Sequence, residues 1–126
     1  MTVLRLAAEF LCWPLWVEPE DDIAHNTEPA SLPISRTLAQ AIADWGDAYD
    51  LTLDQDYPPW SGFPDEPTAA LWLQRGAELA CGLEQEIARS GLPYTVSYGH
   101  AGCLPSAFVR EHSLPAPEGP DGFGPR

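Results

Sequence analysis

Apolar and polar positions alternate near the start of the chain, which predicts a strand over residues 3–10 with one buried face. The two alternating sets are Leu4, Leu6, Ala8 and Phe10 on one side, and Val3, Arg5, Ala7 and Glu9 on the other. Residues 6–9 also favour a helix locally, so helix is the competing interpretation. Residues 13–17 are predicted to be extended as well. Because Pro14 has no N–H for a ladder, this second piece is expected at a sheet edge or a bulge.

A helical repeat of apolar residues follows over residues 36–49, after a long acidic loop at residues 18–33. The repeating positions are Leu38, Ala41, Ile42, Trp45, Ala48 and Tyr49. Ser35 has the hydroxyl that an N-cap requires. The pattern therefore predicts an amphipathic helix that begins after Ser35 and buries Trp45.

A second, longer helix is predicted over residues 66–90. Asp65 suits its N-cap, and Gly91 suits the position just after its end. The buried face is expected to carry Trp72, Leu79, Leu83 and Ile87. Gly76 lies on the same face, where a missing side chain allows a neighbour to approach closely.

Residues 92–98 alternate again and give the clearest strand pattern of the chain. At 126 residues the chain is long enough for one domain with its own core. We therefore predict a single α+β domain over residues 1–103, with a small antiparallel sheet and two helices packed on one face. Residues 104–126 are rich in Pro and Gly without periodicity, and they are predicted to be a disordered tail.

Charge narrows the functional possibilities. The chain has 19 acidic residues against 6 arginines and no lysine, for a net charge of −13. Residues 18–66 contain 12 of the carboxylates and a single cation, Arg36, so 12 − 1 = 11 of the net negative charges lie there. Such a field repels nucleic acid and anionic membranes and speeds encounter with a basic partner. We therefore expect a basic protein partner, no direct nucleic-acid binding and no membrane association.

Aromatic residues within the acidic stretch suggest where such a partner would bind. Tyr57 and Trp60 lie in a Pro-rich loop among carboxylates, as interface hot spots often do. Trp60 is either a plug over the core or an exposed anchor, and the sequence leaves both open. The candidate partner-binding residues are Asp54, Asp56, Tyr57, Trp60, Asp47, Asp50, Glu20, Asp21 and Asp22.

The sequence contains few residue patterns that are typical of catalytic or metal-binding sites. Cys12, Cys81 and Cys103 share no close spacing, which is typical of reduced thiols in a cytosolic protein. His100 and Cys103 could supply two zinc ligands, but zinc takes three or four from protein, and whether the pair forms a site stays open. We predict no cofactor, no metal and no catalytic residue. The lack of a long apolar stretch or a signal-cleavage pattern predicts a cytoplasmic location.

Several segments carry a resemblance to known proteins. They are Cys12-Trp13-Pro14-Leu15-Trp16, Leu32-Pro33-Ile34-Ser35, the Trp45 helix, residues 49–53, Ser61-Gly62-Phe63, and the closing helix with the strand at residues 94–98. Over about two-thirds of its length the chain resembles a group of small bacterial proteins without an assigned activity. In size and acidity it is similar to immunity-type proteins.

Three functional hypotheses follow. The leading one is an immunity or inhibitor protein that neutralises a basic partner such as a toxin or nuclease domain. The second is an inhibitor that mimics DNA, which requires carboxylates spaced like phosphates along one surface. The third is a small enzyme that uses His100 or a pair of carboxylates.

Overall fold

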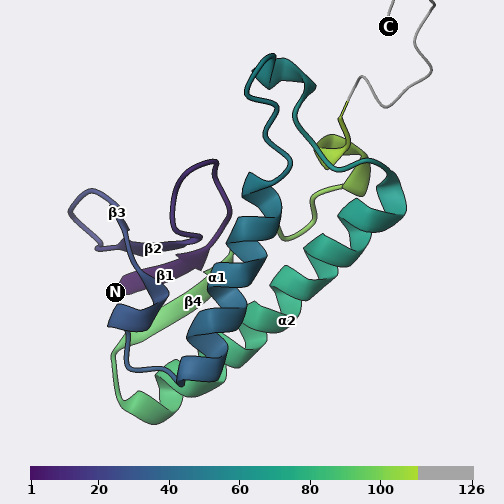
Figure 1. Cartoon of the computed structure of the whole chain (residues 1–126). Helices are drawn as coiled ribbons and strands as arrows, with labels where there is room; N and C mark the ends of the chain where they lie inside the picture. Colours follow the sequence, from purple (N-terminus) through teal and green to yellow (C-terminus); the bar gives the residue numbers. More distant parts are fainter. Residues whose placement is uncertain (111–126) are drawn as a thin grey trace, which may run out of the picture.

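A four-stranded sheet forms one layer of the protein, and two helices form the other (Figure 1). The computed structural model describes residues 1–110. The strands are β1 (Thr2–Leu6), β2 (Leu15–Glu18), β3 (His25–Asn26) and β4 (Tyr94–Tyr98), in the spatial order β3-β2-β1-β4. The predicted α+β class is therefore confirmed.

Strand direction differs from the expected all-antiparallel sheet. β1 pairs antiparallel with β2, but it pairs parallel with β4, so the sheet is mixed. Thr2 lies opposite Tyr94 and Leu6 opposite Tyr98. Parallel neighbours need a long crossover connection. Here the two helices and the two other strands provide it.

The N-terminal segment is shorter as a strand than its alternation predicts. β1 ends at Leu6, and residues 7–14 form the connection to β2. β2 is also not at an edge, because β3 covers its other side. Pro14 is compatible with this inner position because it lies one residue before β2, where no ladder bond is lost.

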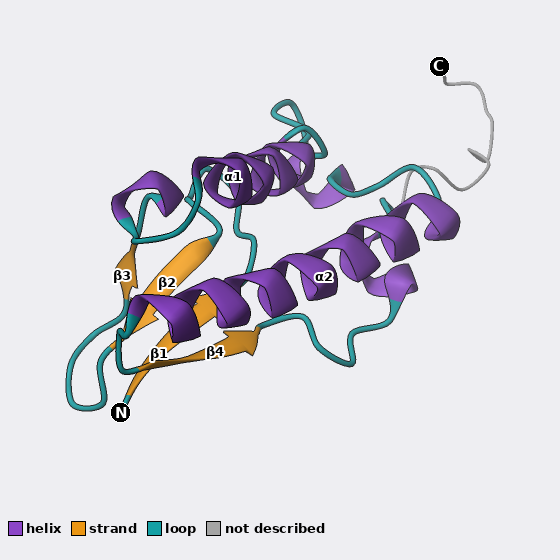
Figure 2. Cartoon of the chain, turned by 90° about the horizontal axis from the view of Figure 1, so that it is seen from below, coloured by secondary structure: helices purple, strands orange, loops and turns teal. Residues whose placement is uncertain are grey.

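Both predicted helices are present, with the predicted caps. They are α1 (Arg36–Asp50) and α2 (Glu66–Ser90), and Figure 2 shows both on the same side of the sheet. The Ser35 hydroxyl and the Asp65 carboxylate each accept a hydrogen bond from the backbone N–H three residues later, at 3.1 and 2.9 Å. Gly91 follows α2 with a φ of 84°, in the left-handed region that glycine tolerates.

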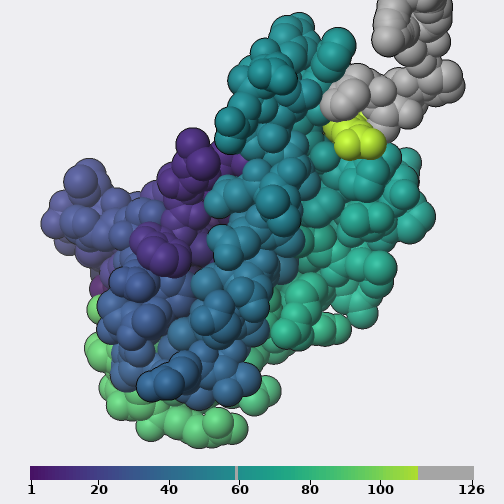
Figure 3. Space-filling view, in the orientation of Figure 1, coloured from purple at the N-terminus to yellow at the C-terminus, as the bar shows by residue number. Residues whose placement is uncertain are grey.

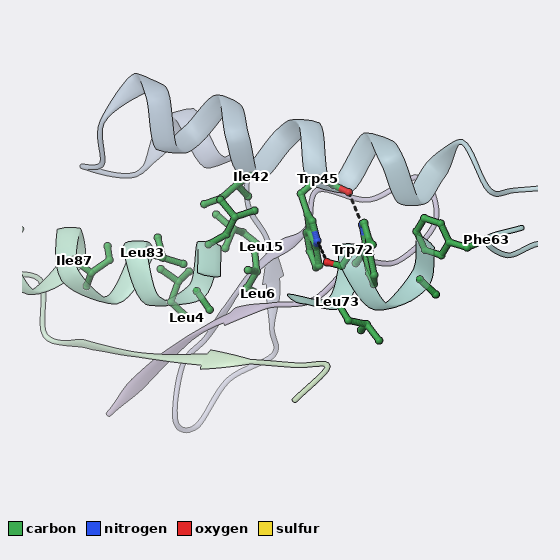
Figure 4. Packing of buried hydrophobic residues seen from close by; sticks show 14 residues of the cluster. Leu4, Leu6, Leu15, Ile42, Trp45, Phe63, Trp72, Leu73, Leu83 and Ile87 are labelled. Carbon is green, nitrogen blue, oxygen red and sulfur yellow. Dashed lines mark hydrogen bonds between the residues drawn. The ribbon is translucent and has the colours of Figure 1, made fainter. Parts of the chain in front are cut away.

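Trp45 and Trp72 join the two helices at the centre of the core (Figure 4). Their rings stack with centroids 4.4 Å apart and planes 3° from parallel. The Trp45 indole N–H donates to the Trp72 carbonyl at 2.9 Å, and the Trp72 indole N–H donates to the Trp45 carbonyl at 3.0 Å. Both polar ring atoms are thus satisfied inside the core, as burial requires. The predicted burial of both tryptophans is confirmed.

Gly76 lets β4 and α1 approach α2. A Cβ at this position would lie 2.4 Å from the Tyr98 hydroxyl oxygen and 2.5 Å from a ring carbon of Trp45, so no side chain fits without displacement. The close approach predicted for Gly76 is therefore confirmed. The Tyr98 hydroxyl donates to the Leu73 carbonyl at 2.7 Å, and burial raises the pKa of Tyr98 to about 12.

Residues 104–110 pack against the domain, although the sequence placed them in the tail. The short helix η3 (Pro105–Phe108) precedes a bridge between Phe63 and Val109. The Phe63 N–H donates to the Phe108 carbonyl at 2.7 Å, and Phe108 packs on the hydrophobic core. Backbone pairing with a distant loop leaves no periodicity to detect in the sequence. The predicted tail over residues 111–126 lies outside the described residues.

Candidate functional site

The connection between α1 and α2, residues 51–65, projects from the body of the protein in Figures 1 and 3. Its tip carries the short helix η2 (Pro58–Trp60). The side chains of Tyr57 and Trp60 are 49% and 44% exposed, and their rings meet edge to face with centroids 4.8 Å apart. Of the two interpretations left open for Trp60, the exposed position is the one observed.

Asp54 holds the same connection in shape. One oxygen of its carboxylate accepts hydrogen bonds from the backbone N–H groups of Asp56 and Tyr57, at 3.0 and 2.9 Å. Its own backbone N–H donates to the Ser61 hydroxyl at 2.7 Å. This carboxylate therefore orients the loop that presents Tyr57, in addition to contributing charge.

Asp50 has a similar double role at the end of α1. Its carboxylate accepts a hydrogen bond from the Leu11 backbone N–H at 3.0 Å. Leu11 has a φ of 63°, a conformation that non-glycine residues seldom adopt. Asp50 thereby fastens the β1–β2 connection to α1. Asp47, one turn earlier, lies on the exposed side of the helix.

Three of the predicted residues lie elsewhere. Glu20, Asp21 and Asp22 are in the β2–β3 connection, and Figures 1 and 2 place this loop far from the α1–α2 connection. Glu20 pairs with the amino group of Met1. The structure therefore gathers six of the nine predicted residues along the second half of α1 and the loop that follows, and it separates the other three.

A groove that the sequence analysis did not predict lies beside α1. It has a volume of about 580 Å³, and its lining includes Trp13, Glu28, Pro29, Arg36, Gln40 and Asp47. The Trp13 side chain is 44% exposed, although its backbone is held firmly. Asn26 accepts from the Trp13 N–H at 2.8 Å and donates to the Trp13 carbonyl at 2.5 Å. The sequence offers one signal for this position: Trp13 precedes a proline, outside any apolar repeat.

His100 serves the packing of the core. Its Nε2 accepts a hydrogen bond from the Ala8 N–H at 2.9 Å, which fixes the neutral tautomer with the proton on Nδ1. The rings of Trp72 and Phe108 both lie 5.4 Å from it. Burial, assisted by the positive charge of Arg5, lowers the pKa of His100. These contacts give His100 a structural role between the N-terminal segment and the aromatic side chains.

His100 and Cys103 are linked through a turn, in which the Cys103 N–H donates to the His100 carbonyl at 3.0 Å. Within residues 1–110, no group of three or more His, Cys, Asp or Glu side chains is placed to hold a metal ion. None of the helices described in that range combines the length and apolarity needed to cross a bilayer.

Comparison with known proteins gives one clear result. The chain has no significant match among curated proteins. Residues 2–100 match the model of a protein family described as Serratia CdiI immunity protein-like. The match covers β1 to β4, both helices and the whole α1–α2 connection. The chain therefore belongs to the Serratia CdiI immunity protein-like family, and this membership implies an immunity protein of contact-dependent inhibition.

Proposed function

We propose that the protein binds and neutralises a toxin domain in the cytoplasm, and that the toxin presents a basic surface to it. Family membership supports the immunity role. The net charge of −13 and its concentration in residues 18–66 support a basic partner. Opposite charge speeds association and disfavours acidic competitors. To neutralise the toxin, the protein only has to cover the surface through which the toxin acts, and no catalytic step is required.

The observation that carries this proposal is the exposed Tyr57–Trp60 pair on a projecting loop. Large aromatic side chains dominate the energy of protein interfaces, particularly where polar groups surround them. Asp54 and Asp56 provide such surroundings here, and Asp54 also fixes the backbone that carries Tyr57. A loop ordered before binding loses less conformational entropy when the partner arrives.

The DNA-mimic alternative receives less support. It requires carboxylates in a continuous row, whereas the β2–β3 and α1–α2 connections lie far apart (Figure 2). Three of the carboxylates on α1 and its following loop also accept backbone hydrogen bonds: Asp50, Asp54 and Asp65. This arrangement suits a compact contact surface with aromatic anchors better than an extended phosphate-like row.

The test is binding to the toxin domain of the matching contact-dependent inhibition system, measured at low and high salt by surface plasmon resonance, which gives both the dissociation constant and the association rate. We expect tight binding by the wild-type protein and a dissociation constant raised at least about tenfold in the Tyr57→Ala/Trp60→Ala double variant. Asp56→Asn should slow association chiefly at low salt, because salt screens exposed charges.

A matched control for the charge change is Glu84→Gln, because Glu84 is an exposed carboxylate on α2, away from this surface. It should leave association unchanged. Absence of wild-type binding at both salt concentrations would refute the proposed function. Growth protection of cells that express the toxin domain gives an independent measure of neutralisation.

A further inference from the structure

We propose that the groove beside α1 is a second contact site, and that it receives an arginine or lysine side chain of the toxin domain with Trp13 as its anchor. We call it the Trp13 groove, with the lining given above. This inference rests on the proposed function. It adds a second contact position, specific for a cationic side chain, to the surface formed by the α1–α2 connection.

The position of Trp13 is fixed by groups other than its own side chain. Asn26 binds its backbone N–H and carbonyl, and a third bond joins the same amide to the Leu15 carbonyl at 3.1 Å. The indole does not belong to the hydrophobic core. Folding therefore does not need this ring in the way that it needs Trp45. An exposed aromatic ring on a rigid backbone is the usual composition of an interface anchor.

The local charge favours a cation at the Trp13 end of the groove. Pro14 lies against Gly46, where an added Cβ would be 2.8 Å from a ring carbon of the proline. Trp13 therefore stands beside the turn of α1 that carries Asp47. Arg36, a cation in the lining, lies eleven residues earlier on the same helix, which corresponds to about 16 Å along its axis.

Arginine and lysine suit such a place for two reasons. A guanidinium or ammonium group is attracted to the face of an indole ring, and tryptophan is the strongest of the aromatic residues in this interaction. A carboxylate beside the ring can take the remaining hydrogen bonds of the cation. Asp47 is available at this end, and Glu28 adds a second carboxylate to the lining of the groove. The proline and alanine residues of the lining can contact the aliphatic stem of the same side chain.

The Trp13 groove also adjoins the surface proposed above. The Leu11 N–H bonds to Asp50, and α1 leads from Asp50 directly into the α1–α2 connection. Figure 3 shows α1 between the N-terminal loops and α2, with the α1–α2 connection above it. One toxin domain can therefore cover the groove and the Tyr57–Trp60 pair together.

Binding of the same toxin domain to single variants, measured in the same way, tests the groove. Trp13→Ala should raise the dissociation constant by about tenfold or more, as loss of an interface anchor does. Asp47→Asn should slow association at low salt and match the wild-type protein at high salt. Ala43→Arg, which adds a cation to the lining without altering Trp13, should also weaken binding. This variant provides a separate test if Trp13→Ala lowers the melting temperature.

The matched control is Ile23→Ala, because Ile23 is 73% exposed in the β2–β3 connection, away from the groove. It should bind like the wild-type protein. If the wild-type protein binds and both Trp13→Ala and Ala43→Arg bind equally well, the groove proposal is overturned while the proposed function stands. If the wild-type protein itself does not bind, the proposed function is overturned.

Discussion

Four of the five tryptophans of this protein lie in two contrasting environments. Trp45 and Trp72 lie between the helices, with stacked rings and both indole N–H groups bonded to the opposite backbone. Trp13 and Trp60 are each 44% exposed, the first in the β1–β2 connection and the second in the α1–α2 connection. The first pair stabilises the fold, since its apolar area is buried whether or not a partner is present.

The second pair keeps much of its apolar area in water in the unbound protein. Burial of that area becomes available only when another molecule covers it. From this difference we propose that folding stability depends on Trp45 and Trp72, and that toxin binding depends on Trp13 and Trp60. The two functions should therefore separate experimentally, and each prediction below tests that separation.

Trp72→Ala should produce the largest effect. It removes a buried ring and the indole N–H that donates to the Trp45 carbonyl, so we expect a loss of about 3–5 kcal/mol in the free energy of unfolding. Urea denaturation followed by circular dichroism measures it. Trp13→Ala is the comparison and should lose less than about 1 kcal/mol. Equal losses in the two variants would contradict the separation.

Gly76→Ala should have the next largest effect. Its Cβ would collide with Tyr98 and Trp45, and such overpacking costs about 1–3 kcal/mol even though alanine favours helices. Gly82→Ala is a matched control on the same helix, where the nearest atom, on Leu38, is 3.6 Å away. That variant should gain up to about 1 kcal/mol. Denaturation midpoints that move in the same direction would show that the contact around Gly76 is not tight.

Acidification should weaken the aromatic core through His100. Because burial lowers the folded-state pKa of His100, the unfolded chain takes up more protons there than the folded protein as the pH falls. The contribution of neutral His100 to the free energy of unfolding is complete above the ordinary histidine pKa of about 6.5. It is lost as the pH falls through the lowered folded-state pKa. Unfolding free energies measured between pH 7 and pH 5 should decrease.

His100→Gln is the matching variant, because its side-chain oxygen can accept the Ala8 bond without titrating. The decrease between pH 7 and pH 5 should become smaller in this variant. An unchanged dependence on pH would mean that His100 is not responsible for it.

Tyr57→Ala should have the smallest effect on stability, within about 0.5–1 kcal/mol, because half of its side chain is already in water. Thermal denaturation checks this value, and the binding measurement supplies the contrast. A large loss of stability would place Tyr57 with the structural aromatics and remove it from the proposed surface.

Local signals predicted the helices well. The apolar repeats around Trp45 and Trp72, and the capping residues Ser35 and Asp65, gave both helices nearly at their observed ends. These features depend on neighbours within one or two turns, which the sequence displays directly. The placement of Gly76 against another element was predictable for the same reason, since it interrupts an apolar face.

Features that depend on distant residues were not predictable. The direction of β4 relative to β1 is set by how the intervening chain returns, and alternation of side chains is the same in both directions. The Trp13 groove forms only because Asn26 and Pro14 position one loop against α1. Trp60 carried two open interpretations, because a loop sequence does not specify which side of the loop faces the core.

The parallel pairing of β1 with β4 also affects how the protein is made. β1 is synthesised well before its second neighbour, β4 (Tyr94–Tyr98), which is among the last parts of the matched domain to be translated. Until then one edge of β1 stays open, and contacts this distant in sequence form slowly. An incomplete chain can build its helices but cannot close its sheet. A cell therefore gains a fully folded copy only after nearly the whole domain has left the ribosome, which links the onset of protection to complete translation.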